Sequence, residues 1–175
     1  MKRKWILWSI LATLVLAIVV HVVTLVVLPY VIMNAYMANH EINVLTHTGR
    51  NTSASRDVAR PNADMYFSNM AYDLSKGPIL FTAPVPVDHY WSVSYYANNS
   101  DNFFVINDAQ VKSNPVKILL ITKGMKYSNP DNAQVVTSPT IRGVMLVRQA
   151  VPDEDRLDEV ANLQKQSSVS FPETP

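Results

Sequence analysis

The sequence of 175 residues is short of cysteine, glycine and charge. It contains no cysteine, which excludes a disulfide scaffold, a zinc–cysteine site and a thiol nucleophile. Only four glycines are present, and no glycine-rich phosphate loop can be found. Charged residues make up 17% of the chain, and 15 basic side chains against 14 acidic ones leave a net charge of +1. That balance excludes a strongly basic nucleic-acid binder and an acidic disordered chain.

The apolar residues are concentrated near the N-terminus. Between Trp5 and Met33 there is no charged residue, and the only residues that are not apolar are Ser9, Thr13, His21, Thr24 and Pro29. About 20 apolar residues span a bilayer, so the segment predicts a transmembrane helix. A cleaved signal peptide has an apolar core of roughly 7–15 residues and a small-x-small cleavage site, whereas this run is longer and ends with a poor site at Tyr36 and Ala38. We therefore expect an uncleaved signal anchor within residues 1–33.

The flanking residues predict the orientation of this anchor. Lys2, Arg3 and Lys4 precede the run directly, and the positive-inside rule keeps such a basic stub in the cytoplasm. The rest of the chain is then exported, which for a bacterial inner-membrane protein means the periplasm. Trp5 and Trp8 lie near one interface of the predicted span, and Tyr30 lies near the other. His21 lies in the middle of the span, where an ionisable side chain is unusual. His21 is either a neutral imidazole that faces a partner helix or a carbonyl, or part of a transport or channel accessory.

The sequence after the anchor predicts a connector, a β-domain and a tail. Residues 34–59 are expected to form the connector, with helix continuing to Leu45 and a polar linker from Thr46 to Ser55. Residues 60–166 carry short strand signals separated by turns, and residues 167–175 are expected to be a flexible tail. The expected strands are Met65–Tyr72, Ile79–Ala83, His89–Ala97, Phe103–Ile106, Val116–Thr122 and Ile141–Arg148.

These strands predict a mainly β fold, an antiparallel β-sandwich or jelly-roll-like domain. In His89–Ala97, apolar residues alternate with Tyr90, Ser92, Ser94 and Tyr96, which predicts one buried face. After Pro152, three acidic residues and a modest apolar stripe that includes Val160 and ends near Gln164 predict a C-terminal helix.

Common catalytic motifs are missing, and the histidines are scattered, so we expect no metal site and no cofactor. The densest polar cluster is Arg60 to Tyr66. Asn62 and Asp64 can bond backbone groups and organise a loop, or Asp64 and Tyr66 can line a polar pocket. Asp73 is expected to cap a turn. Arg142 shares a strand face with Arg148, either as a solvated edge or as an anion site. The candidate binding residues are Asn62, Asp64, Tyr66 and Arg142.

Several segments, in order, resemble domain-of-unknown-function family 1254. The family opens with Pro-Asn-x-Asp-Thr-x-Tyr and Asp-Leu-x-x-x-Pro, and the matching segments here are Pro61–Tyr66, Tyr72–Pro78, Asp88–Val93, Ala97–Phe103, Ser138–Thr140, Gly143–Arg148 and Asp153–Gln164. The resemblance implies a β-rich fold and no established activity. Met65 stands where the family has threonine, and the segment Lys123–Tyr127 replaces its glycine-rich turn, so the chain departs from the family pattern at these two places.

In larger members this domain precedes a second one, of family 1214. The resemblance therefore implies a short membrane-tethered version that pairs with a separately encoded 1214-type membrane protein. We expect an interaction or ligand-binding module of the cell envelope. The alternative is a membrane-tethered hydrolase with Asn62, Asp64 and Tyr66 at its site, where the carboxylate would act as a base and the phenol as a donor.

Overall fold

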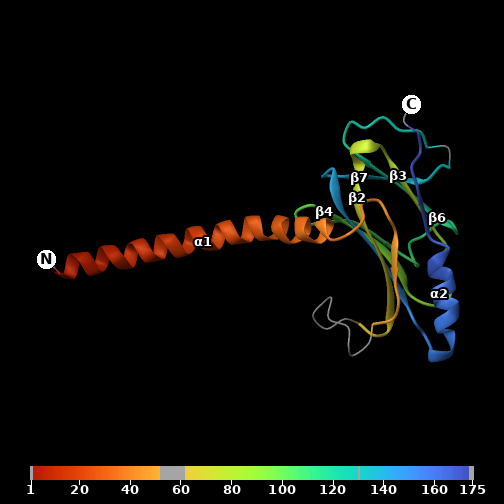
Figure 1. Ribbon diagram of the computed structural model, residues 1–175, viewed down its shortest axis with the longest axis horizontal. Helices are drawn as coiled ribbons and strands as arrows, with labels where there is room; N and C mark the ends of the chain where they lie inside the picture. The colour runs from red at the N-terminus through yellow and green to blue at the C-terminus, as the bar shows by residue number, and fades with distance from the viewer. Residues whose placement is uncertain (1, 52–61, 130, 174–175) are drawn as a thin grey trace.

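A single long helix projects from a β-sandwich (Figure 1). The structure is a computed structural model, and it describes residues 2–51, 62–129 and 131–173. Helix α1 (Lys2–Ala38) has 37 residues and is therefore about 56 Å long. It is the one helix in the described ranges that is long and apolar enough to cross a membrane. Most of its large apolar side chains are exposed, as a membrane anchor or a signal sequence requires.

The two threonine hydroxyl groups inside α1 are satisfied within the helix. Thr13 donates to the Ser9 carbonyl oxygen at 2.9 Å and Thr24 donates to the Val20 carbonyl oxygen at 2.8 Å. Such bonds to the preceding turn make a hydroxyl tolerable in lipid because no donor is left without a partner. The polar residues of the apolar segment thus do not interrupt the helix.

Two sheets form the domain, as the sequence predicts. The first, here called the front sheet, has five antiparallel strands in the order β1 (Thr46–Thr48), β2 (Met65–Asp73), β8 (Arg142–Ala150), β4 (Trp91–Ala97) and β5 (Asn102–Asn107). The second, the back sheet, has the order β7 (Gln134–Ser138), β6 (Val116–Thr122), β3 (Ile79–Ala83) and β9 (Ser168–Ser170). Strand β7 runs parallel to β6, and all other pairs are antiparallel.

The core lies between the two sheets. Trp91, Val93 and Tyr95 of β4 are at most 1% exposed and point into it, which confirms the predicted alternation. The expectation that β4 has only one buried face was wrong, because Ser92 and Ser94 on its other face are also buried. β4 has neighbouring strands on both sides, and a serine side chain is short enough to be covered by their larger residues.

Short polar strands account for the other differences from the sequence-based expectation. Thr46–Thr48, expected in a linker, pairs with β2, and Ser168–Ser170, expected in a frayed tail, pairs with β3. Gln134–Ser138 was not expected to be a strand at all. Each has only three to five residues and lies at the edge of a sheet, where pairing rather than an apolar pattern decides the conformation. Helix α1 ends at Ala38 and does not continue to Leu45.

The expected C-terminal helix is present as a short 3-10 turn, η2 (Glu154–Arg156), followed by α2 (Leu157–Lys165). Val160 and Gln164 are its buried residues, and the helix packs against β2 and β8. Another 3-10 turn, η1 (Leu74–Lys76), follows β2 at the other end of the sandwich. Helix α2 lies on the side of the domain away from α1 (Figure 1).

Candidate functional site

The four candidate binding residues do not meet in one place. Asn62, Asp64 and Tyr66 lie where β2 begins, whereas Arg142 is the first residue of β8. In the antiparallel register, Met65 pairs with Ala150 and Asp73 pairs with Arg142. The two groups are therefore separated by nearly the full length of β2, about 27 Å. Arg60 and Pro61, which belong to the same motif, lie outside the described residues.

At the start of β2, the polar residues organise the turn that enters the strand. The Asn62 Oδ1 accepts the Asp64 backbone N–H at 2.9 Å, and the Asp64 carbonyl oxygen accepts the Val151 N–H at 2.8 Å. The Asp64 side chain is 82% exposed and lies 4.0 Å from Arg50 Nη2. This geometry supports the loop-organising interpretation of Asn62 and Asp64. No sequence pattern marks Arg50, which lies in the predicted connector and donates to Glu154 Oε1 at 2.6 Å.

At the other end of β2, Asp73 caps η1 as expected and also pairs with Arg142. Its Oδ1 accepts the Ser75 N–H at 2.8 Å and its Oδ2 accepts from Arg142 Nε at 2.7 Å. Burial acts to raise the pKa of Asp73, but hydrogen bonds from Ser75 and Arg142 outweigh it and lower the pKa below its usual value. The Asn43 amide brackets the Asp73 backbone, accepting its N–H and donating to its carbonyl oxygen. Arg142 itself is 61% exposed, so it forms a surface ion pair.

A second network, which the sequence did not indicate, surrounds His89. The His89 side chain is only 3% exposed, with Nδ1 2.9 Å from Asp88 Oδ1 and Nε2 3.2 Å from the Gln149 amide. Because an amide nitrogen donates, Nε2 is the acceptor and the ring is held as the Nδ1–H tautomer. Asp88 also accepts from Arg156 at 2.7 Å, and hydrogen bonds from Arg156 and His89 lower the pKa of Asp88 to about 2. The network joins the loop before β4 to β8 and to η2.

His47 and Ser68 form a histidine–serine pair of the kind that activates a nucleophile, with 2.9 Å between Nδ1 and Oγ. Ser68 is 1% exposed, however, and its Oγ accepts the Gln164 amide at 3.0 Å. A hydroxyl buried under α2 cannot reach a substrate. Burial and the nearby Lys165 ammonium lower the pKa of His47. The pair therefore connects β1, β2 and α2. Among the described residues there is no group of three or more His, Cys, Asp or Glu side chains that could hold a metal ion.

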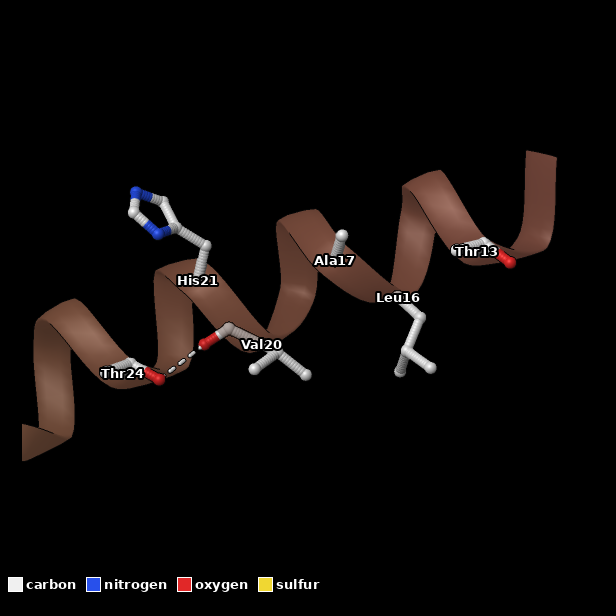
Figure 2. A pocket seen from close by; sticks show the side chains of 6 residues that line it. All are labelled: Thr13, Leu16, Ala17, Val20, His21 and Thr24. Carbon is white, nitrogen blue, oxygen red and sulfur yellow. Dashed lines mark hydrogen bonds between the residues drawn. The ribbon is translucent and has the colours of Figure 1, made fainter. Parts of the chain in front are cut away.

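Figure 2 shows the middle of α1, where Thr13, Leu16, Ala17, Val20, His21 and Thr24 line a shallow pocket on the helix surface. The His21 ring points away from the helix, while Thr24 turns back to the Val20 carbonyl oxygen. Both interpretations of His21, as a neutral imidazole that faces a partner helix or a carbonyl and as part of a transport or channel accessory, remain predictions.

The strongest structural feature is the joint between α1 and the front sheet. Met33 and Met37 are 9% and 6% exposed, and they pack against Ala71 of β2 and Val144 of β8. Tyr36 of α1 and Tyr96 of β4 flank this cluster. One helical turn earlier, Ser100 in the β4–β5 turn donates to the Pro29 carbonyl oxygen at 3.4 Å.

The contacts of the joint follow one row across the sheet. Tyr96 pairs with Val144, and Val144 pairs with Ala71, so the three residues stand side by side on β4, β8 and β2. The end of α1 therefore passes across the strands, from the β4–β5 turn toward β2 (Figure 1). This apolar contact along one face of α1 sets the direction in which the helix leaves the domain.

The structure thus defines a class: an antiparallel-rich β-sandwich joined without a free linker to an apolar helix of membrane-spanning length. The chain belongs to the family of proteins of unknown function called DUF1254, whose model matches residues 42–170. The match includes β1 and β9, and so extends beyond residues 60–166 on both sides.

Two solved structures share the fold. The VPA0106 protein from Vibrio parahaemolyticus has a TM-score of 0.60 and 11% identity over 66% of this chain and 31% of its own. An uncharacterized protein from Burkholderia cenocepacia has a TM-score of 0.52 and 12% identity over 82% of this chain and 39% of its own. This chain thus spans well under half of either structure. No curated protein matches it.

Proposed function

We propose that this protein is a single-pass membrane protein that holds a DUF1254 domain directly on the surface of a bacterial inner membrane, as an interaction module of the cell envelope. The observation that carries the proposal is the joint. Met33 and Met37 are buried against the front sheet, so the domain is fastened to α1 and does not swing on a flexible tether. A fixed orientation is useful to a protein that presents one surface to a partner, and unnecessary for one that is only retained at the membrane.

The proposed orientation places the N-terminus in the cytoplasm and the domain in the periplasm. Arg3 and Lys4 at the start of α1 support it through the positive-inside rule. The polar clusters of the domain support binding over catalysis, since Asn62, Asp73, His89 and Ser68 are each committed to holding backbone or neighbouring elements.

The proposed partner is a separately encoded membrane protein of the 1214 type. The solved structures of the same fold extend far beyond the region that this chain matches, since it covers 31% and 39% of them. Co-expression of a tagged full-length chain with a 1214-type protein, followed by purification in detergent, tests this: a stoichiometric complex is expected, and two separate monomers would contradict it.

The absence of cysteine makes the membrane orientation directly measurable. Full-length variants carry one cysteine each, either Asp158→Cys on the exposed side of α2 or a cysteine added ahead of Lys2. A membrane-impermeant maleimide is applied to intact spheroplasts and then to lysed ones. We expect Asp158→Cys to react in intact spheroplasts and the N-terminal cysteine to react only after lysis. The reverse pattern, or loss of the N-terminal segment by mass spectrometry, would contradict the proposal.

A further inference from the structure

The two ends of the apolar segment are marked by aromatic side chains. Trp8 and Tyr30 lie about 33 Å apart along the axis of α1. With a tilt of about 20°, this length matches a hydrocarbon core of about 30 Å. Aromatic rings of this kind settle at the two interfaces. If α1 spans a bilayer, as proposed above, Tyr30 marks the surface on the side of the domain.

The β4–β5 turn is held at the same depth as Tyr30. Ser100 of this turn donates to the carbonyl oxygen of Pro29, the residue that precedes Tyr30. From there, α1 continues across the front sheet past Tyr96 and Val144 to Ala71, which takes it over β4, β8 and β2 in turn. The helix thus meets the β5 side of the sheet first, and the β2 side lies farther from the bilayer.

Strand β5 is the edge strand on that side, with no further strand beside it in the described sheet. Its sequence is unusually apolar for an exposed edge. Val105 is 54% exposed, and Phe103 and Phe104 are partly exposed while their rings pack against Tyr95. Natural proteins cover or charge such edges because free backbone groups beside apolar side chains invite aggregation. The adjoining turn is polar, which suits a headgroup layer.

We propose that strand β5 and the turn of residues 98–101 rest in the interfacial layer of the bilayer that α1 spans. The phospholipid headgroups cover the free edge of β5, and Val105 faces the top of the acyl chains. The inference rests on the proposed function, because it needs α1 to span the membrane. It adds a specific lipid-contacting surface and therefore leaves the β1 edge and the back sheet as the faces open to a protein partner.

Fluorescence quenching in vesicles tests this surface. The full-length chain, carrying a single NBD-labelled cysteine, is reconstituted into phosphatidylcholine–phosphatidylglycerol vesicles with or without nitroxide lipids, which bear the nitroxide near the headgroup in one set of vesicles and near the end of the acyl chain in another. The labelled positions are Val105→Cys and Ser100→Cys at the proposed surface, Asp158→Cys on α2 and Val19→Cys inside α1. We expect nitroxide lipids to quench the labels at positions 105, 100 and 19, and to leave the label at position 158 at its unquenched intensity.

The outcomes separate the two proposals. A quenched label at position 19 with unquenched labels at both 105 and 100 would overturn the lipid-contacting surface and leave the membrane anchor standing. Labels at 105 and 100 that are shielded from aqueous iodide but not quenched by nitroxide lipids would also overturn it, because a protein would then cover the edge. An unquenched label at position 19 would contradict the anchor itself, and with it the inference.

Discussion

Gly143 lies where two tyrosines leave no space for a methyl group. A Cβ at this position would clash with the Tyr96 carbonyl oxygen and the Tyr72 hydroxyl, which is itself bonded to Ser138 in the core. We expect Gly143→Ala to lower the free energy of unfolding by about 1–3 kcal/mol through overpacking. Urea denaturation measures the change. Gly49→Ala is the control because nothing lies within 4 Å of its Cβ, and an equal loss in both variants would contradict this explanation.

Asp73 makes the stability of the domain sensitive to acid. Its folded-state pKa lies below the usual value, so its contribution is complete above the unfolded-state pKa, near 4, and is lost as the pH falls through the folded-state pKa. Asp73→Asn keeps an acceptor for the Ser75 N–H but cannot pair ionically with Arg142. We expect the wild type to lose more stability than this variant when denaturation is compared at pH 6 and at about pH 3. Parallel losses would show that Asp73 does not contribute.

At the residue scale, the sequence predicted local roles better than contacts between distant residues. The roles of Asn62 in a turn and of Asp73 as a cap followed from their short-range hydrogen bonding, and both are seen. His89, by contrast, contacts Gln149 directly and Arg156 through Asp88. Both residues are distant from His89 in the sequence. No local pattern marks residues that meet only after the strands have paired.

Helix α2 is held to the front sheet by a buried glutamine. Gln164 donates to the Phe67 carbonyl oxygen at 2.7 Å and to Ser68 Oγ at 3.0 Å, and it is 6% exposed. Gln164→Ala leaves buried acceptors without a donor, so we expect a loss of about 1–3 kcal/mol and faster hydrogen exchange in α2. Gln166→Ala is the matched control, since Gln166 is exposed and bonds only within its own helix. Hydrogen exchange in α2 that becomes faster by the same factor in both variants would contradict this role of Gln164.

Two buried methionines hold the end of α1 against the front sheet. We expect Met33→Ala with Met37→Ala to weaken the docking of α1 by about 2 kcal/mol or more, because both side chains are buried against Ala71 and Val144. Hydrogen exchange in the last turns of α1, in detergent micelles, measures the effect. Ile32→Ala is the control because that side chain is 57% exposed. Unchanged protection in the double variant would mean that the methionines do not hold the helix.

The long and strongly patterned elements were predictable from the sequence, and the short ones were not. Helix α1, the strands β2, β3, β4, β6 and β8, and the C-terminal helix all carry enough apolar residues for their period to be read. β1 and β9 consist of serine, threonine, histidine and one valine, so only pairing with β2 and β3 makes them strands. The docking of α1 was also missed, because Met33 is the last residue of the apolar span and Met37 lies in the predicted connector.

At the scale of the whole molecule, the joint holds the β-sandwich in one orientation relative to α1. In the proposed arrangement the β5 edge faces the membrane, and α2 lies on the side of the domain away from α1 (Figure 1). A partner that approaches within the membrane or from the periplasm would meet the same surfaces in every copy. This is the property that distinguishes the proposed interaction module from a domain on a flexible tether.

One distance measurement tests this central claim most directly. The full-length chain, in lipid nanodiscs, carries spin labels at Val19→Cys in α1 and Asp158→Cys in α2, and double electron–electron resonance records the distribution of distances between them. We predict a single narrow distribution that broadens when Met33 and Met37 are both replaced by alanine. A distribution that is already broad in the parent chain would contradict the account, because the domain would then move freely relative to its helix.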